Sequence, residues 1–471
     1  MPQDEATVGS SDARPQGRSD ERSIPFDVEV FIDSRPIGWR HFTALGLCAA
    51  LLFLDGFDVF LMGKLAPAIA RDMGQPSSAM TMVFFWQQVG LAAGAFLIGP
   101  AADRYGRKTT LVTSCFCFGV LTLAATFAQS LGQLALLRGL SGIFLSGVLP
   151  VTLALLAELT PKRRRGLFLS LTMVGYSAGG ASGAAVAAWL LGPYGWRIGF
   201  WIGGIAPTVL APALFFLVGE SLLYRLARNA PAAAVGKALR RIDPRVVLTG
   251  TEEFISRNRS RAAGGSSPLA IFREGRLPAT ALLWGACFLS MGNIALLASW
   301  MATFFFELGG VPIAAFAKAS LLSFAGGLAG TLLVGPLLDR FRPTAVLAAF
   351  YVANGAALIG LGQVSFGAPI FVPLLLCWSF CQSGGQAGLN SFIAQFYPTE
   401  MRGTGFSWAG GAGRIGGVVS PLLGGLAVAI ALPLEVTLTL VALAAFTVAV
   451  IVLVLGSICR TGEPALKAAT R

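Results

Sequence analysis

Two carboxylates, Asp55 and Asp58, lie within an otherwise apolar stretch, residues 42–70, that is long enough to cross a bilayer. A charged side chain at the bilayer centre costs at least about 2.5–3.5 kcal/mol, so acids there mark an ion or substrate pathway. Three residues along a helix turn a side chain by about 300° and raise it by about 4.5 Å. The spacing therefore predicts both acids on one face, lining a single cavity and responding to protons.

Two arginines supply the opposite charge. Arg138 and Arg414 are the only arginines within the predicted spans. A guanidinium holds a carboxylate through two hydrogen bonds and stays charged when buried. We expect both to bind an anionic substrate and Arg138 also to modulate the acids. The alternatives are an ion pair of Arg138 with Asp55 or Asp58, and a gating role for Arg414.

Lys64 is a further cation in the helix that carries the acids. It either extends toward the outer membrane surface or attracts an anionic substrate.

A flat aromatic ligand needs apolar walls and a few hydrogen-bonding groups. We expect substrate contacts from Phe57, Trp300, Gln386 and Asn390, the last two of which stand four residues apart on one helix face. For any single aromatic residue, packing is the alternative. Further candidates of the same kinds are Trp86, Tyr176, Trp408, Gln87 and Asn293.

The composition places these residues in a membrane. Of 471 residues, 55% are hydrophobic and 12% charged, and the mean hydropathy is +0.71. Apolar stretches of spanning length occur at 42–66, 79–102, 110–129, 132–157, 167–191, 198–219, 279–306, 315–338, 344–362, 370–397, 404–431 and 434–457. The sequence thus predicts an all-α polytopic membrane protein with twelve transmembrane helices.

Two motifs recur about half a chain length apart. Residues 99–104 (GPAADR) return at 335–340 (GPLLDR), and residues 161–166 (PKRRRG) return at 398–403 (PTEMRG). Two pseudo-symmetric six-helix bundles with a substrate site between them are a known transporter arrangement. No nucleotide-binding GxxxxGK[ST] loop occurs, which excludes that kind of pump.

The bundles divide the chain into five parts. We expect a polar, disordered N-terminal tail (1–41), a first bundle (42–220), a central linker (221–278), a second bundle (279–457) and a C-terminal tail (458–471). With both termini in the cytoplasm, 29 of the 35 Lys and Arg residues fall in cytoplasmic segments. We expect the chain to be a monomer in the cell inner membrane.

The net charge of +12 follows from these loop residues facing anionic lipid headgroups. It does not indicate nucleic-acid binding. The cysteine pairs 115/117 and 377/381, with a single histidine, do not make a metal site. We expect no cofactor beyond the proton as coupling ion.

The repeated loops carry charges suited to a gate. Ion pairs between helices can form when one side closes and break when it opens. The alternative is that these residues only anchor helix ends. The expected gate residues are Asp103, Arg104, Arg107, Glu158 and Arg165 in the first half, and Asp339, Arg340 and Arg402 in the second, where Gln395 replaces the acid.

Residues 99–108 (GPAADRYGRK) resemble the signature loop of the major facilitator superfamily. The DGFD motif at 55–58 and the runs at 397–405, 413–416, 161–166 and 195–197 resemble the aromatic acid/proton symporters of that superfamily. This resemblance implies the major facilitator fold, alternating access and inward transport of a carboxylate with protons.

The sequence thus predicts a secondary active transporter, not an enzyme, that imports an aromatic or related organic carboxylate with protons. The alternatives are a proton-coupled carrier of a sugar or non-aromatic organic acid, a multidrug or metabolite exporter, and a membrane sensor. The absence of a GPxxGG pattern from the fifth span favours symport over export.

Overall fold

The computed structural model describes residues 24–228, 230–242, 246, 252–255, 272, 276–397 and 401–461. Its long helices form two halves of six. The first half contains α2 (Trp39–Asp72), α3 (Met80–Tyr105), α4 (Arg107–Ala125), α5 (Leu131–Leu159), α6 (Lys162–Trp189) and α8 (Arg197–Leu217). The second contains α12 (Leu277–Thr303), α13 (Ile313–Arg340), α14 (Pro343–Gln363), α15 (Phe371–Phe396), α16 (Arg402–Ala429) and α17 (Leu434–Thr461). Short turns η1 (Ser77–Ala79), α7 (Leu191–Tyr194) and η3 (Phe304–Leu308) join some of them.

All twelve predicted spans are helices, most of them longer than their apolar stretches. Within the described ranges, ten helices are apolar enough to cross a membrane by length and composition. The other two, α6 and α15, are long enough but rich in Gly, Ser, Gln and Asn. Both contribute residues to the interior between the halves, where small and polar residues are tolerated in membrane proteins.

A single glycine connects α3 to α4. Gly106 has a φ of 101°, a conformation that residues with a Cβ rarely adopt. A Cβ there would also lie 2.2 Å from a carboxylate oxygen of Glu220. This residue therefore allows the abrupt turn that brings the predicted gate residues of the 99–108 motif together.

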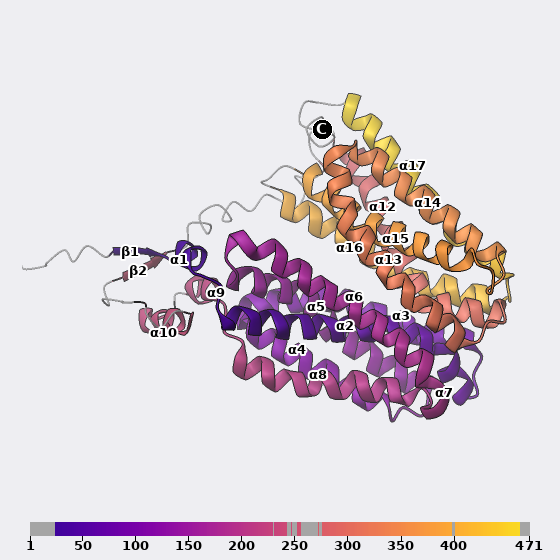
Figure 1. Cartoon of the computed structure of the whole chain (residues 1–471), viewed down its shortest axis with the longest axis horizontal. Helices are drawn as coiled ribbons and strands as arrows, with labels where there is room; N and C mark the ends of the chain where they lie inside the picture. The colour runs from indigo at the N-terminus through magenta and orange to yellow at the C-terminus, as the bar shows by residue number, and fades with distance from the viewer. Residues whose placement is uncertain are drawn as a thin grey trace, which may run out of the picture.

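The two halves meet at one side of the molecule and separate at the other. We call the side with the Gly106 turn and the first residue of α12 the linker side, and the side with η1 and η3 the far side. In Figure 1 the halves are spread apart at the linker side and converge toward the far side. On the far side, Ser77 Oγ donates a 2.6 Å hydrogen bond to Glu307, and Arg71 lies 5.0 Å above the Phe306 ring.

A small lobe outside the bundles was not predicted. Strands β1 (Ile24–Asp27) and β2 (Glu252–Ile255) pair in parallel, next to helices α1 (Val28–Ser34), α9 (Leu222–Ala227) and α10 (Ala232–Ile242). Side chains including Val28, Phe31, Leu222 and Leu239 form its apolar core. The expectation of a disordered 1–41 tail is therefore wrong for residues 24–41, since this segment buries apolar side chains against the linker. Residues 1–23 and 462–471 lie outside the described part.

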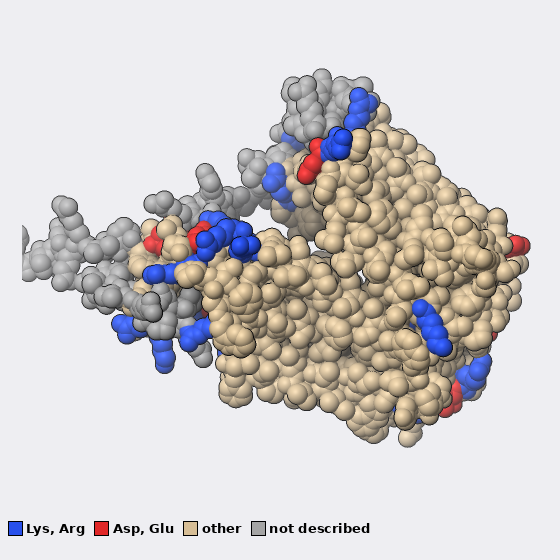
Figure 2. All heavy atoms as spheres, in the orientation of Figure 1, with Lys and Arg blue, Asp and Glu red and all other residues tan. Residues whose placement is uncertain are grey.

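The charged surface agrees with a membrane protein. Figure 2 shows Lys and Arg side chains gathered mainly at the ends of the molecule, with a broad uncharged band over the helices between them. The exposed apolar residues of the long helices include Phe96, Val209, Leu332 and Leu443. The protein is thus a multi-pass membrane protein by both helix composition and surface.

Candidate substrate site

Asp58 and Arg138 form a buried ion pair inside the first half. The two terminal nitrogens of Arg138, on α5, each donate to one carboxylate oxygen of Asp58, on α2, the Nη1 bond measuring 2.8 Å. Arg138 is 1% exposed and Asp58 3%. The Arg138 guanidinium also lies 5.8 Å from the Phe200 ring centre. This is the ion-pair alternative predicted for Arg138, in which each terminal nitrogen donates one hydrogen to Asp58 while Nε has no hydrogen-bond partner.

Asp55 faces the other half. Its carboxylate interacts electrostatically with Asp58 on the same helix, with Arg414 on α16 and with the Tyr176 hydroxyl on α6, without a direct ion pair. Asp55 is 6% exposed, and Arg414 is partly buried. The structure therefore places Asp55 and Arg414 near one another across the division between the halves.

Asp55 and Asp58 have different partners in this structure, and the expectation that both line one cavity stays a prediction. A separation of three residues leaves a residual rotation of about 60° between the side chains, in addition to the rise. This rotation directs Asp58 toward α5 in its own half and Asp55 toward α16 in the other. Neither carboxylate belongs to the cavity wall described next.

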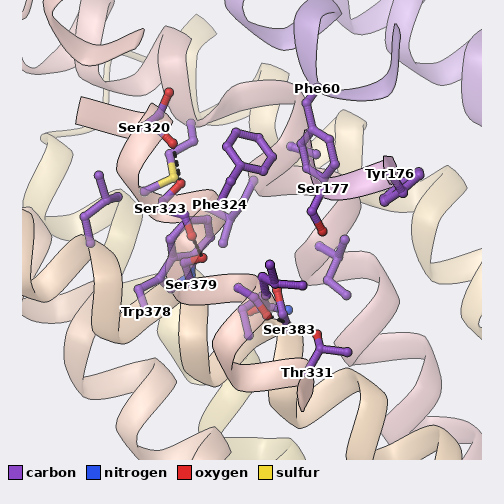
Figure 3. A pocket seen from close by; sticks show the side chains of 18 of the residues that line it. Phe60, Tyr176, Ser177, Ser320, Ser323, Phe324, Thr331, Trp378, Ser379 and Ser383 are labelled. Atoms are coloured by element: carbon purple, nitrogen blue, oxygen red, sulfur yellow. Dashed lines mark hydrogen bonds between the residues drawn. The ribbon is translucent and has the colours of Figure 1, made fainter. Parts of the chain in front are cut away.

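A cavity of about 250 Å³ lies between the halves. The first half contributes Phe60 and Lys64 from α2 and Tyr176 and Ser177 from α6; the second contributes residues of α12, α13 and α15. Figure 3 shows Phe60, Tyr176 and Phe324 on one side and the hydroxyl groups of Ser323, Ser379, Ser383 and Thr331 nearby. The volume lies just below the range typical for drug-sized ligands, so it suits a small ligand with one ring.

Aromatic side chains from both halves make the cavity wall. The Phe60 and Phe324 rings meet edge to face, with centres 5.1 Å apart and planes at 88°. Phe60 also lies 6.0 Å from the Tyr176 ring. Gly180 of α6 allows this approach, because a Cβ there would lie 2.3 Å from Phe324. A planar apolar ligand in this cavity could therefore contact both the faces and the edges of these aromatic rings.

Lys64 is the cationic residue of this cavity wall. It is 8% exposed, its Nζ donates a 2.9 Å hydrogen bond to the Phe60 carbonyl, and it lies 5.7 Å from the Phe324 ring centre. Lys64 therefore does not extend to the membrane surface, which was one of its two predicted placements.

The second half contributes neutral polar groups. Ser323 donates to the Ser320 carbonyl at 2.6 Å, and Ser379 donates to the Ser323 carbonyl, so these hydroxyl hydrogens are engaged within the protein. Unlike these hydroxyl groups, two donors of the second half are without a hydrogen-bond partner: the buried indole Nε1 of Trp378 and the buried amide Nε2 of Gln382. Other buried donors without a partner occur among the described residues, such as Trp284 Nε1 and Trp300 Nε1, but those of Trp378 and Gln382 belong to residues of the cavity wall, where a ligand could bond to them.

The other predicted substrate residues lie outside this cavity wall. Phe57 is 2% exposed and packs against Gly203 in the first half. Trp300 is fully buried, against Gly424 and 5.2 Å from the Phe84 ring across the division between halves. Both are packing residues in this structure, and a substrate contact for either remains only a prediction.

Gln386 and Asn390, on α15, belong to a chain of hydrogen bonds that also includes Ser290 of α12 and Tyr351 of α14. Ser290 bonds to the Tyr351 hydroxyl at 2.6 Å and donates to Gln386 at 2.7 Å, and Gln386 donates to Asn390 at 3.1 Å. The two residues share a face as predicted, but they lie beyond the cavity wall. Of the remaining candidates, Tyr176 lines the cavity, Trp86 and Trp408 are exposed, and Gln87 and Asn293 are buried elsewhere.

The predicted gate of the first half is assembled on the linker side. Arg107 lies 3.0 Å from Glu158 and 3.6 Å from Asp103, and Glu158 also accepts a hydrogen bond from Ser221. Glu158 thus pairs with Arg107, whereas Arg165 forms no ion pair among the described residues and its Nε has no hydrogen-bond partner. The backbone carbonyl of Arg104 accepts bonds from the Tyr224 hydroxyl and the Arg228 guanidinium, which tie the lobe to this turn.

The corresponding residues of the second half are not paired in this way. Among the described residues, Asp339, Arg340 and Arg402 form no ion pair, and Arg340 instead lies 5.8 Å from the Phe341 ring. The motif at 398–400 lies outside the described residues. Gating roles in both halves remain predictions.

Sequence reasoning missed most of the cavity wall, including the four residues used in the argument below: Phe60, Phe324, Trp378 and Gln382. Phe60 could have been found, because it lies one helical turn before Lys64 on the same face. The other three come from α13 and α15, whose rotation toward the first half depends on packing that one sequence does not reveal.

Comparisons with known proteins agree with this architecture. The model of the Major Facilitator Superfamily matches residues 48–421 and, in a second match, 310–468. The chain is 36% identical to a gallate transporter of Pseudomonas putida over 405 residues, 86% of this chain and 89% of the relative. It is 32% identical to the 4-hydroxybenzoate transporter PcaK of Acinetobacter baylyi over 421 residues, 89% of this chain and 91% of that one.

Solved structures share the fold. The inward-open xylose transporter XylE of E. coli matches with a TM-score of 0.66 and 13% identity, covering 88% of this chain and 96% of that one. A bacterial homologue of the lysosomal transporter Spinster matches with a TM-score of 0.65 and 16% identity, covering 89% of this chain and 97% of that one. The twelve-helix arrangement, the family model and the curated relatives lead to one conclusion: this chain belongs to the Major Facilitator Superfamily, in its family of aromatic acid transporters.

Proposed function

We propose that this protein is a secondary active transporter that imports an aromatic carboxylate together with protons by alternating access. The observation that carries the proposal is the cavity between the halves, which combines aromatic walls, a buried ammonium group and unpartnered hydrogen-bond donors. The similarity to gallate and 4-hydroxybenzoate transporters supports the same substrate class. The protein would act as a monomer without a cofactor.

We assign the linker side to the cytoplasm of the cell inner membrane, with both termini there. The count of Lys and Arg in the loops supports this orientation, since such residues accumulate in cytoplasmic loops. In this orientation the described conformation opens toward the cytoplasm and is closed on the outside by contacts such as Ser77 to Glu307. It then corresponds to the state that releases substrate after import.

The proton site is proposed at Asp55 and Asp58, with unequal roles. Asp58 is held by Arg138 inside one rigid half, whereas the counter-charge of Asp55, Arg414, belongs to the other half. When the halves rock, the surroundings of Asp55 change and those of Asp58 do not. We therefore assign proton exchange to Asp55 and structural support of that helix to the Asp58–Arg138 pair.

Coupling to protons can offset the energetic cost of moving an anionic substrate into the cell. A carboxylate entering the cell moves against an inside-negative potential, at a cost of about 2.3 kcal/mol per charge per 100 mV. One accompanying proton makes the transport electroneutral, and a second would use the potential to drive accumulation.

Uptake into proteoliposomes tests the function. With the outside acidified, we expect accumulation of a radiolabelled hydroxybenzoate that a protonophore abolishes. Excess hydroxybenzoates and phenylpropanoids should compete, whereas muconate-like diacids and sugars should not. Accumulation driven by an opposite gradient would indicate an exporter, and competition by sugars alone would indicate a different substrate.

The same system tests the proton site. Asp55→Asn should abolish proton-driven accumulation but retain exchange of external for internal substrate, because exchange needs no net proton movement. Proton-driven accumulation that survives in both Asp55→Asn and Asp58→Asn would refute the assignment.

A further inference from the structure

Lys64 has a buried charge that is not part of the proposed proton site. Arg138 has Asp58 as its counter-charge, and Arg414 has Asp55 nearby. Lys64, in contrast, forms no ion pair with a carboxylate in the described part of the chain, and its hydrogen bond goes to a neutral carbonyl. Burying an ammonium group without an anion costs several kcal/mol. Such a group is explained if an anion arrives during the transport cycle.

The position of Lys64 fits an incoming carboxylate. It lies on the cavity wall beside Phe60 and Phe324, on the portion of α2 that leads to the closed far side. There, Gly63 packs so closely on the second half that a Cβ would lie 2.1 Å from the Ala298 carbonyl. A carboxylate at Lys64 would therefore rest at the closed end of the cavity.

The two arginines are less suitable for this role. Both terminal nitrogens of Arg138 are engaged by Asp58, and the pair is almost fully buried within the first half. Arg414 interacts with Asp55, and neither of them lines the cavity. A substrate carboxylate at Arg138 would have to displace Asp58, and one at Arg414 would lie outside this cavity wall and close to the charge of Asp55.

The opposite wall of the cavity carries hydrogen-bond donors for oxygen substituents on the ring of the ligand. Trp378 and Gln382 lie one turn apart on α15, and each presents a buried donor without a partner. Gln382 is 7% exposed, and its side-chain oxygen already accepts a 2.8 Å bond from Asn354, so its amide hydrogens remain free. These groups can donate to oxygen atoms on a ring, such as phenolic hydroxyls.

We propose that Lys64, and neither membrane arginine, binds the substrate carboxylate, while Trp378 and Gln382 in the second half bind oxygen substituents of its ring. This assignment rests on the proposed function, since it takes the ligand to be an aromatic carboxylate. Phe60 and Phe324 contact the ring between these ends. One ligand then joins both halves, its charge recognised by the first and its hydroxyl groups by the second.

Comparing the binding of an aromatic acid with that of its neutral amide distinguishes recognition of the carboxylate by Lys64 from general packing. The ligands are 4-hydroxybenzoate and 4-hydroxybenzamide, measured by calorimetry on the purified full-length protein. We expect the wild type to prefer the acid about 10- to 100-fold, as for a hydrogen bond between charged groups. Lys64→Met should remove this preference while binding the amide as the wild type does, and Lys64→Arg should retain most of it.

The control is Lys318→Met, on the exposed surface of α13, which should keep the wild-type preference. An unchanged preference in Lys64→Met would overturn the assignment. Loss of both ligands with a lower melting temperature in Lys64→Met would give Lys64 a structural role and overturn it as well. A wild type that binds no aromatic acid would instead reject the proposed function and this inference together.

Discussion

The two halves repeat one fold but carry different chemistry. The first half holds Asp55, Asp58, Lys64 and Arg138 buried within its helices. The cavity wall of the second half consists of hydroxyl, amide, indole and apolar groups, with no charged residue. A repeated sequence motif therefore does not imply a repeated function. The first half provides the charged residue of the cavity wall and both acids of the proposed proton site, and Arg414 of the second half is the counter-charge of Asp55. The cavity wall of the second half provides neutral groups that distinguish one ring from another.

The linker side shows the same asymmetry. The 99–108 motif of the first half is engaged in ion pairs and in contacts with the lobe, whereas its copy in the second half forms none among the described residues. Of the described linker residues, Tyr224 and Arg228 bond to the first half, whereas Phe272 and Arg276, next to α12, contact the second half. Motion of the second half relative to the first half and the lobe is the simplest form of rocking that these contacts permit.

The largest expected effect comes from separating the buried ion pair. Asp58→Ala leaves Arg138 charged and unpaired in the first half, at a cost of about 3–5 kcal/mol. We expect a large drop in melting temperature and loss of uptake. In the second half, Tyr351→Phe removes only a neutral hydrogen bond to Ser290 and should cost about 1 kcal/mol. Equal losses in the two variants would contradict the division between charged and neutral halves.

The next effect concerns the joint between the halves. Gly63→Ala places a methyl group 2.1 Å from the Ala298 carbonyl, so the far side cannot close as described. Overpacking of this kind costs about 1–3 kcal/mol, and we expect slower uptake with little loss of folded protein. Gly46→Ala on the same helix is the matched control, because nothing lies within 4 Å of that position. Identical uptake rates in both variants would show that this contact does not govern closure.

A smaller effect should appear in ligand selectivity. Gln382→Leu removes one neutral donor, so binding of 4-hydroxybenzoate should weaken about 2- to 10-fold while benzoate binding stays unchanged. Calorimetry with both ligands measures this ratio, and Gln363→Leu at the exposed end of α14 serves as control. An equal loss for both ligands would mean that Gln382 acts through packing and not on the ring hydroxyl.

The smallest effect concerns docking of the lobe. Asp33 accepts a 2.8 Å hydrogen bond from the Lys162 amide and lies 3.0 Å from its ammonium group. Partial burial raises the pKa of Asp33, but the hydrogen bonds and charge of Lys162 outweigh this and lower it below its ordinary value. The contact is thus complete above the ordinary pKa and is lost as the pH falls through the lowered one.

Hydrogen exchange of α1 should therefore stay constant from pH 8 to pH 5, after correction for the intrinsic rate, and rise only below about pH 4. In Asp33→Asn it should already be faster at neutral pH, since the charge is gone. Exchange that changes near pH 6 would point to a different group.

The sequence alone determined the class, the helices and the family. Apolar length fixes where a chain can cross a bilayer, so all twelve spans could be predicted without knowing their neighbours. The two motifs that recur half a chain length apart likewise revealed the two halves from the sequence alone. The ends were less predictable: α2 begins at Trp39 and α17 continues to Thr461, because helices extend beyond the apolar stretch into the interface.

Only the tertiary structure decided which groups meet. Asp55 and Asp58 share a helix, yet a rotation of about 60° gives them counter-charges in different halves. Lys64 faces a cavity instead of the membrane surface because α12 and α13 pack against its face of α2 and α6. Trp378 and Gln382 reach the same cavity from a helix more than 300 residues later. Hydropathy sets the position of a helix along the membrane normal, but its rotation and its partners depend on packing between segments distant in sequence.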